Sequence, residues 1–260
     1  MNPIEVIELE HGLHQLRVSR FGAHLLSWHY QGKQQLWLSE LADLSGTKPI
    51  RGGVPLCFPW FGDLQPGPSH GFARTSLWQL HEQGSDKLIF RLTESDATLA
   101  LWPHRFEALL CIELEQHSLS LSLTVRNTDQ HPWSFSGALH SYFAVDDVNQ
   151  CQLPAIQGRY HHDKLSGQRL QFDTARVPVP VDSVVPDLHE MTFDAFTLRH
   201  HGADATVVWN PGLAVAAKMA DVDPASSHRF LCLEAAIAMT PIRLAPGQTH
   251  ELRQCIDMGA

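Results

Sequence analysis

Alternation of apolar and polar residues is the dominant pattern in this chain, and it is typical of β-strands that are buried on one face. The clearest case is residues 119–125, Leu-Ser-Leu-Ser-Leu-Thr-Val, in which every second side chain is apolar. Residues 108–115 form a second such run, and the polar residues 116–118 between the two predict a hairpin. Amphipathic stretches of helical length are scarce, and residues 36–43 could form at most about two turns. The sequence therefore predicts an all-β fold of antiparallel sheets with little helix.

Shorter strand-like runs recur along the whole chain, at residues 13–18, 23–30, 76–80, 88–92, 133–138, 139–145, 206–209, 213–219, 230–235 and 249–256. Strands this numerous leave long exposed edges unless they form two packed sheets or a barrel. The apolar content of 43% is enough to bury such a core. Because no linker, repeat or step in composition divides the chain, we expect a single domain over residues 1–260.

Composition also restricts the partners and location of the protein. The chain has 19 basic and 28 acidic residues, a formal net charge of −9, which opposes binding to nucleic acid and anionic membranes. Its start lacks a signal-peptide pattern, and no apolar run is long enough to span a bilayer. We therefore expect a cytoplasmic protein with no nucleic-acid or membrane partner. The five scattered cysteines contain no CxxC pair and predict reduced thiols without a disulfide framework or zinc site.

A rigid stretch rich in glycine, proline and aromatic residues carries two arginines and a histidine. Residues 49–62 read Pro-Ile-Arg-Gly-Gly-Val-Pro-Leu-Cys-Phe-Pro-Trp-Phe-Gly, and residues 69–74 read Ser-His-Gly-Phe-Ala-Arg. A guanidinium presents a planar fork of donors that matches a carboxylate or phosphate, so Arg51 and Arg74 predict a small anionic ligand. The alternative is a structural loop whose arginines cap backbone carbonyls.

Two further residues could carry acid and base chemistry. His140 lies in a strand-like run of small and aromatic residues, and Glu234 is the only charge in the apolar run 230–239. Each has a structural alternative, because a buried histidine or carboxylate can also hold a hydrogen-bond network together. Together with nearby arginines they would form an acid and base pair beside an anion site. No nucleotide-binding, metalloprotease or serine-hydrolase motif is present, and adjacent histidines such as 161–162 and 200–201 do not predict a metal site.

The chain resembles the aldose 1-epimerase superfamily, and within it the hexose-6-phosphate mutarotases (glucose-6-phosphate 1-epimerases). The resemblance rests on the order of six motifs, at residues 51–55, 70–74, 139–143, 208–211, 232–234 and 244–249. It implies a galactose mutarotase-like β-supersandwich with an open carbohydrate cleft, which agrees with the strand pattern.

The resemblance also implies roles for individual residues. His140 would donate a proton to the sugar ring oxygen, while Glu234 removes the proton of the C1 hydroxyl. Ring opening, rotation and reclosure would then interconvert the α and β anomers of a hexose 6-phosphate without cofactor or metal. The implied substrate-binding residues are Arg51, Arg74, His70, Asp182 and Ser69. The phosphate would suit the two arginines.

Two other functions compete with this hypothesis. The first is a non-catalytic carbohydrate-binding β-sandwich, since such folds host binding modules as well as enzymes. The second is glycoside hydrolysis, which would need a second carboxylate facing Glu234. We expect a monomer whose partner is a small phosphosugar, and we expect Lys218 and Asp221 to remain solvated.

Overall fold

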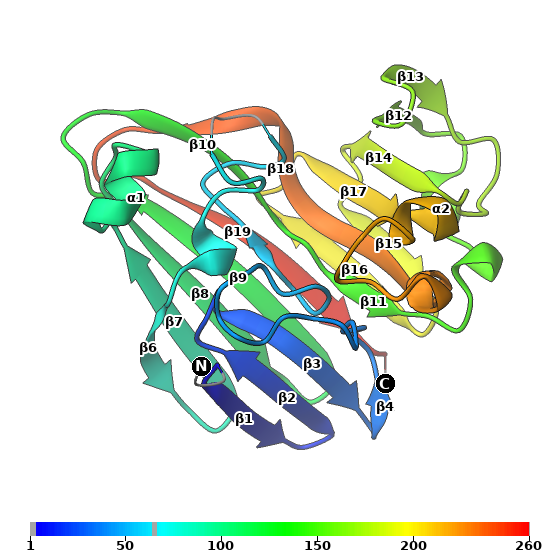
Figure 1. Cartoon of the computed structure of the whole chain (residues 1–260), viewed down its shortest axis with the longest axis horizontal. Helices are drawn as coiled ribbons and strands as arrows, with labels where there is room; N and C mark the ends of the chain where they lie inside the picture. The colour runs from blue at the N-terminus through cyan, green and yellow to red at the C-terminus, as the bar shows by residue number, and fades with distance from the viewer. Residues whose placement is uncertain (1–3, 64–66, 260) are drawn as a thin grey trace.

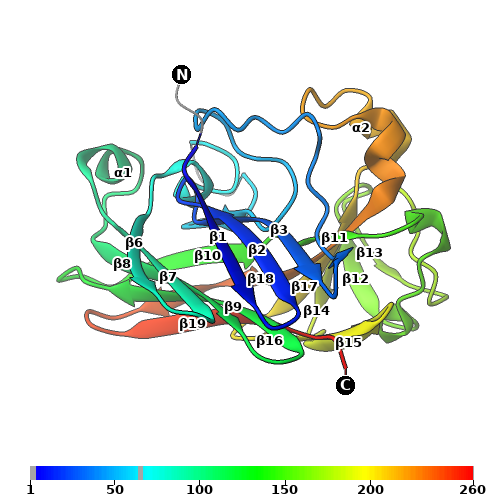
Figure 2. The same ribbon diagram turned by 90° about the horizontal axis from the view of Figure 1, so that it is seen from below.

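The computed structural model describes residues 4–63 and 67–259. The strands in these residues form three antiparallel sheets (Figures 1 and 2). The N-terminal sheet has four strands in chain order, β1 (Val6–His11), β2 (His14–Ser19), β3 (His24–Tyr30) and β4 (Lys33–Gln34). It lies in front of the other sheets at the lower part of Figure 1, where its strands are blue. The predicted antiparallel, strand-rich architecture is confirmed.

The second sheet, called the site sheet below, has eight strands. In spatial order they are β13 (Gln168–Gln171), β12 (Tyr160–Asp163), β14 (Val181–Pro186), β17 (Ala205–Asn210), β18 (Phe230–Leu244), β10 (Trp133–Leu139) and β5 (Leu56–Cys57), with β11 (Tyr142–Ala144) also paired to β18.

The third sheet, called the back sheet, has seven strands. Their order is β15 (Glu190–Phe193), β16 (Phe196–His201), β19 (Thr249–Asp257), β9 (Ser118–Asn127), β8 (Phe106–Leu114), β7 (Lys87–Thr93) and β6 (Gln79–Gln83). The predicted hairpin is β8 and β9, joined across residues 115–117.

The main core contains residues of all three sheets, and β18 shows how alternation builds it. Leu231, Leu233 and Ala235 are fully buried in this core, together with alternate leucines of β9. The residues between them point to the opposite face of the site sheet, where Cys232 and Ala236 belong to separate apolar clusters. Glu234 shares this second face. The strand pattern thus places the lone carboxylate on the face that is turned away from the main core.

Helical segments are short, and one of them replaces an expected strand. The helices are α1 (Asp96–Leu101) and α2 (Gly212–Ala216), with single 3-10 segments η1 (Ala73–Thr75), η2 (Val148–Gln150), η3 (Pro154–Ile156) and η4 (Pro224–Arg229). In the described part of the chain, no helix is long and apolar enough to cross a membrane. The strand expected at residues 213–219 is wrong, because α2 occupies its first half. Strand β17 stops at Asn210, whose side chain accepts the Gly212 N–H, and Pro211 has no N–H to continue a ladder.

The two-turn helix considered for residues 36–43 does not form. Its backbone groups bond outward instead: the Trp37 N–H donates to Tyr142, and the Ser39 N–H donates to Arg51. This segment therefore supports the loop that carries Arg51. The expected strand over residues 139–145 is also interrupted, since β10 ends at Leu139 and β11 begins at Tyr142.

Candidate active site

His140 and Glu234 face each other across two neighbouring strands of the site sheet. Leu139 at the end of β10 pairs with Ala235 on β18, so the next position along each strand sets His140 opposite Glu234. Strand β11 pairs with β18 in the same register beyond this point. The His140 Nε2 atom lies 3.4 Å from Glu234 Oε1. Side chains that are directly opposite in an antiparallel pair are expected to touch in this way.

Both side chains of this pair are almost completely buried, His140 with 7% and Glu234 with 1% of its surface exposed. Burial lowers the pKa of His140 well below its usual value, and the nearby positive charges of Arg51 and Arg74 act in the same direction. Burial raises the pKa of Glu234 well above its usual value. Among the described residues, His140 Nδ1 and Glu234 Oε2 have no hydrogen-bond partner. A polar ligand could satisfy them.

Aromatic rings surround the histidine. The His140 ring stacks on Tyr142, with centroids 4.8 Å apart and planes 11° apart. The Trp209 ring of β17 forms a T-shaped contact with the His140 ring at a centroid distance of 5.8 Å, and the centroid of the His70 ring lies 5.9 Å away. These rings restrict the orientation of the imidazole and give the site an apolar wall.

The loop carrying Arg51 is held against the pair by backbone hydrogen bonds. The N–H of His140 donates to Pro55, and the N–H of Tyr142 donates to Gly53. Gly53 has a φ of +60°, and a Cβ at this position would lie 2.2 Å from the Leu25 carbonyl oxygen. Only glycine fits such a position without displacing the backbone.

The Arg51 side chain forms hydrogen bonds with two other side chains of the site. Its Nε donates to Asp221 at 3.0 Å, and its Nη1 donates to the Tyr142 hydroxyl at 2.9 Å. Although burial opposes its charge, Tyr142 and Asp221 raise the pKa of Arg51. The expectation that Asp221 would stay solvated is therefore wrong, because it forms a half-buried ion pair with Arg51. In the described structure Nη2 of Arg51 is left for a ligand.

Arg74, Ser69 and His70 form a second group, around η1 and the turn before it. Arg74 Nη2 donates to the Ser69 carbonyl at 2.6 Å, so this arginine does cap a backbone carbonyl. Its Nε is buried and has no partner among the described residues. His70 Nδ1 accepts the Gly62 N–H, and burial, followed by the charges of Arg74 and Lys164, lowers the pKa of His70 to about 3. His70 is therefore neutral and can present Nε2 as a donor.

Asp182 enters the site from β14, next to a lysine that the sequence reasoning missed. Asp182 pairs in the sheet with Trp209, and Lys164 Nζ lies 3.9 Å from its Oδ1. Burial raises the pKa of Asp182, and the charge of Lys164 opposes this rise. Lys164 also lies over the Phe61 ring, 5.3 Å from the centroid. Its position depends on the β12–β13 hairpin folding beside β14, and no local sequence motif marks it.

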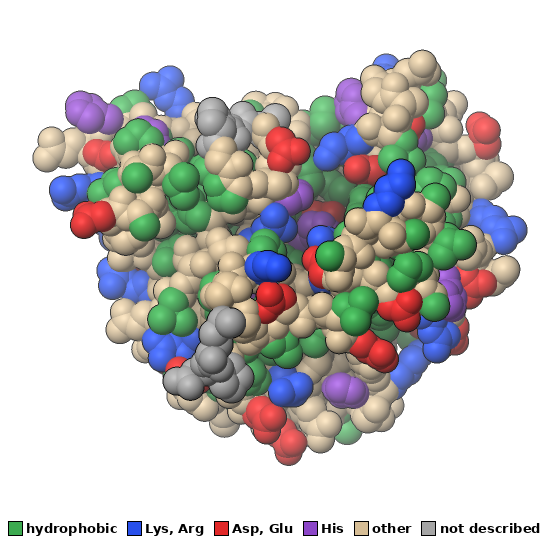
Figure 3. All heavy atoms as spheres, in the orientation of Figure 1, with side chains coloured by type: hydrophobic (Ala, Val, Ile, Leu, Met, Phe, Trp, Pro, Cys, Tyr) green, Lys and Arg blue, Asp and Glu red, His purple; other side chains and the backbone are tan. Residues whose placement is uncertain are grey.

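An open pocket of about 560 Å³ adjoins these residues, within the size range of small-molecule sites. It is lined mainly by Phe61, Ser69, His70, Lys164, Val184 and Met239. Figure 3 shows a hollow in this face of the molecule, in which basic, acidic and histidine side chains gather. The structure thus brings all seven predicted site residues to one region.

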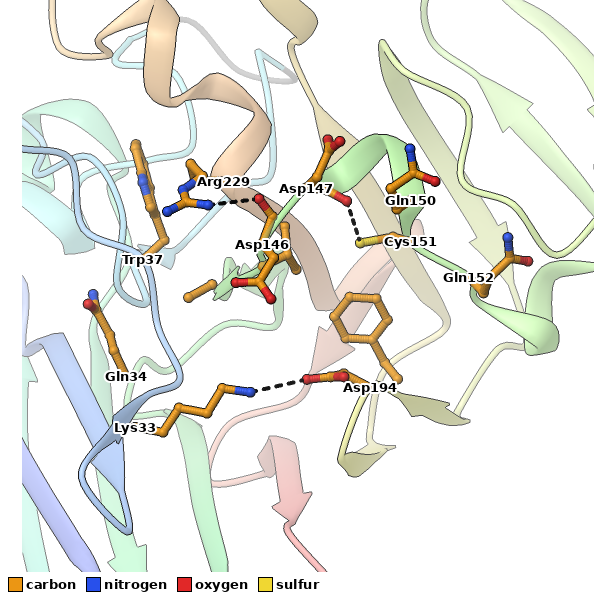
Figure 4. Close-up of a pocket in the computed structure, with 13 residues that line it drawn as sticks. Lys33, Gln34, Trp37, Asp146, Asp147, Gln150, Cys151, Gln152, Asp194 and Arg229 are labelled. Carbon is orange, nitrogen blue, oxygen red and sulfur yellow. Dashed lines mark hydrogen bonds and ion pairs between the residues drawn. The ribbon is translucent and has the colours of Figure 1, made fainter.

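A second pocket, of similar volume, is lined by Trp37, Asp194 and Arg229 among others (Figure 4). Its charged groups are largely engaged: Lys33 pairs with Asp194 at 3.6 Å, and Arg229 donates to the Asp146 carbonyl at 2.9 Å. None of the seven predicted site residues lines this pocket, whereas Ser69 and His70 line the first one. No group of three or more potential metal ligands occurs within residues 4–63 and 67–259.

Comparison with known proteins gives a consistent result. The family model described as aldose 1-epimerase matches residues 5–256. A Salmonella typhimurium protein named "Putative glucose-6-phosphate 1-epimerase" is 32% identical, covering 98% of this chain and 91% of the relative. The crystal structure of a "putative mutarotase" from Salmonella typhimurium superposes with a TM-score of 0.85 at 29% identity, over 99% of this chain and 91% of that one. A "galactose mutarotase related enzyme" from Lactobacillus acidophilus has a TM-score of 0.77 at 14% identity, covers 98% of each chain and shows the shared fold alone.

Proposed function

The chain belongs to the aldose 1-epimerase family, and we propose that it interconverts the α and β anomers of a hexose 6-phosphate, with glucose 6-phosphate as the first substrate to test. The observation that carries this proposal is the buried contact between His140 and Glu234. Each has one atom with no partner in the described structure, beside a pocket that fits a small molecule. The name of the Salmonella typhimurium relative supports the choice of sugar.

The proposed reaction needs one proton to be given and one to be taken. Glu234 takes the proton of the C1 hydroxyl, and His140 gives a proton to the ring oxygen as the bond between that oxygen and C1 breaks. The resulting aldehyde rotates about the bond between C1 and C2. Reclosure on the other face of the carbonyl returns both protons, with the two residues in reversed roles. The pair ends in its starting state, so the mechanism uses no cofactor.

Three cations could hold the phosphate. Arg51 and Arg74 each have a side-chain nitrogen that has no hydrogen-bond partner among the described residues, and Lys164 lines the adjoining pocket. Charge-assisted hydrogen bonds of this type are about twice as strong as neutral ones. They would attract an anionic sugar to a protein whose formal net charge is −9.

Saturation-transfer NMR on equilibrated glucose 6-phosphate tests the proposed activity. The protein should add exchange between the α and β signals above the rate in an inert buffer at neutral pH. The absence of added exchange would refute the activity, while binding without exchange would indicate a carbohydrate-binding protein.

Phosphate recognition is tested separately, by comparing glucose with glucose 6-phosphate at low and high salt. We expect faster exchange with the phosphosugar and a smaller advantage at high salt, because exposed charge contacts are screened. Lys164→Met should raise KM for the phosphosugar by roughly tenfold. Lys218→Met, which changes an exposed lysine after α2, is the matched control. Equal KM values for the two variants would exclude Lys164 from phosphate binding.

A further inference from the structure

A chain of buried polar groups crosses the core directly behind the candidate active site. It links four side chains and ends on two backbone carbonyls. The side chains are Ser141, Gln254, His200 and Thr206, each exposed by 3% or less, and the carbonyls belong to Leu233 and Leu188. Gln254 and His200 come from β19 and β16 of the back sheet, whereas the other side chains belong to the site sheet or its interruption after β10. The chain therefore connects the two sheets.

The hydrogen bonds of this chain run in one consistent direction. The Ser141 hydroxyl donates to Gln254 Oε1. The two Gln254 Nε2 hydrogens go to the Leu233 carbonyl at 3.0 Å and to His200 Nε2 at 2.9 Å. His200 must then carry its proton on Nδ1, which lies 2.9 Å from Thr206 Oγ1, and the Thr206 hydroxyl donates to Leu188. Every donor has an acceptor, as a buried polar network requires.

Gln254 sits where this chain meets the candidate acid and base. Ser141 directly follows His140, and Leu233 directly precedes Glu234. The hydrogen-bond ladder between β10 and β18 is interrupted at this point, because the His140 N–H donates to the Pro55 carbonyl and not to β18. The Leu233 N–H still donates to the Ser141 carbonyl, at 3.2 Å. Gln254 adds a bond to each of these two residues, so one side chain joins the neighbours of both members of the pair.

We propose that Gln254 is a positioning residue. From the back sheet it forms hydrogen bonds to Ser141 and Leu233, and these bonds set the separation of His140 and Glu234. This role rests on the proposed function, because it concerns the geometry of the acid and base. An apolar side chain could fill the same volume without a buried amide, so stability alone does not require a glutamine here. What an apolar residue cannot do is fix the register of two backbone segments through paired hydrogen bonds.

The direct test is Gln254→Met, which nearly keeps the side-chain volume and removes the hydrogen bonds to Ser141 and Leu233, together with the one to His200. A displacement of about 1 Å between reacting groups can lower a rate by about 10²-fold. We therefore expect kcat for sugar exchange to fall by about 10- to 100-fold, with KM changed much less. Asn127→Leu is the matched control. Asn127 is another fully buried amide, bonded to carbonyls of His131 and Leu244 at the far end of β18. It should lower the melting temperature and leave kcat unchanged.

A double variant separates positioning from stability. Gln254→Met leaves the Ser141 hydroxyl without its acceptor, and Ser141→Ala in the same protein removes that unpaired group. The melting temperature should then recover in part, while kcat should stay low. Recovery of kcat together with the melting temperature would overturn the positioning role, as would an equal loss of kcat in Asn127→Leu.

One readout does not depend on catalysis. The imidazole ¹⁵N resonances of His140 should shift in Gln254→Met and remain in place in Asn127→Leu. If the wild type shows no sugar exchange, the proposed function fails, and these resonances still decide whether Gln254 positions the pair. Unchanged resonances in Gln254→Met would refute the positioning role even in an active enzyme.

Discussion

The contact between His140 and Glu234 joins two groups whose pKa values are shifted in opposite directions by the same cause. Burial disfavours the charged form of each, so it lowers the pKa of the imidazole and raises that of the carboxyl. The pair consequently keeps one proton over a wide range of pH, and burial favours this proton on Glu234. Attraction between an imidazolium and a carboxylate at 3.4 Å favours its transfer to His140. A pair that holds one proton is what a reversible acid and base reaction requires.

The pH dependence of kcat/KM should show a plateau between the lowered pKa of His140 and the raised pKa of Glu234. Below the lowered pKa of His140 the pair carries two protons and has no base, so the acid limb should lie well below pH 6.5. Above the raised pKa of Glu234 it carries none and has no acid, so the alkaline limb should lie well above pH 4.5. The measurement is NMR exchange from pH 4 to 9, corrected for the phosphate ionisation near pH 6. An acid limb at 6.5, as for a solvated histidine, would contradict the burial argument.

Replacing Glu234 by glutamine should remove the base and keep the shape of the site. We expect exchange to slow by about 10²- to 10⁴-fold, the usual contribution of general acid and base catalysis. Glucose 6-phosphate binding, measured by calorimetry, should remain within a few fold. Glu113→Gln changes a half-buried carboxylate of the back sheet and controls for loss of charge. A Glu234→Gln protein as fast as the wild type would exclude Glu234 as the base.

At the scale of elements, the loop from Ile50 to Pro55 depends on the backbone of Gly53. Gly53→Ala should displace this loop, since the new Cβ would lie 2.2 Å from a carbonyl oxygen of β3. Gly32→Ala is the matched control, because Gly32 also has a positive φ, +75°, but has no atom within 4 Å of the added Cβ. Denaturant unfolding measures both. In the control, the free energy of unfolding should fall by about 1–2 kcal/mol because of backbone strain. In Gly53→Ala it should fall clearly further, and exchange activity should be lost as well.

An equal loss in the two glycine variants would mean that the loop adapts around the added methyl group. A large loss of activity in Gly32→Ala would indicate that general instability, and not displacement of Arg51, accounts for the effect.

Strands buried on one face could be predicted from sequence because their signal is local. The run at residues 119–125 lies within β9, and its hairpin partner is β8. Residues 213–219 gave a false strand signal, since alternation in so short a run does not exclude a helix once Pro211 and Gly212 redirect the chain. The six-residue helix α1 was missed because it is too short to show a helical period.

The candidate site was predictable where the residue itself is unusual. Glu234 could be identified because one charge in an apolar strand needs an explanation, and His140 because its motif resembles a known family. Lys164 and Gln254 gave no such signal, since their contacts arise only when a hairpin or a second sheet packs beside the site. The pair of Arg51 with Asp221 joins residues 170 positions apart. Such pairings belong to the tertiary fold and not to any local pattern.

For the molecule as a whole, buried histidines make stability depend on pH. Burial lowers the pKa of His24 to about 4 and that of His200 to about 3, whereas an unfolded chain would have a value of 6.5. Above pH 6.5 both states are neutral and stability is unaffected. As pH falls from 6.5 toward the folded pKa, only the unfolded state takes up protons. The free energy of unfolding should then fall by about 1.4 kcal/mol per pH unit for each such histidine.

His200→Gln tests this dependence, because glutamine keeps a donor and an acceptor for the groups around it but cannot titrate. The free energy of unfolding is measured with guanidinium at pH 7, 6, 5 and 4.5. Below pH 6 its slope against pH should be smaller in this variant than in the wild type, by the contribution of about one proton. The control is His201→Gln, which changes the neighbouring exposed histidine on the same strand and leaves His200 in place. Equal slopes for His200→Gln and the wild type would mean that His200 also takes up a proton in the folded state below pH 6.5, which would contradict the effect of its burial.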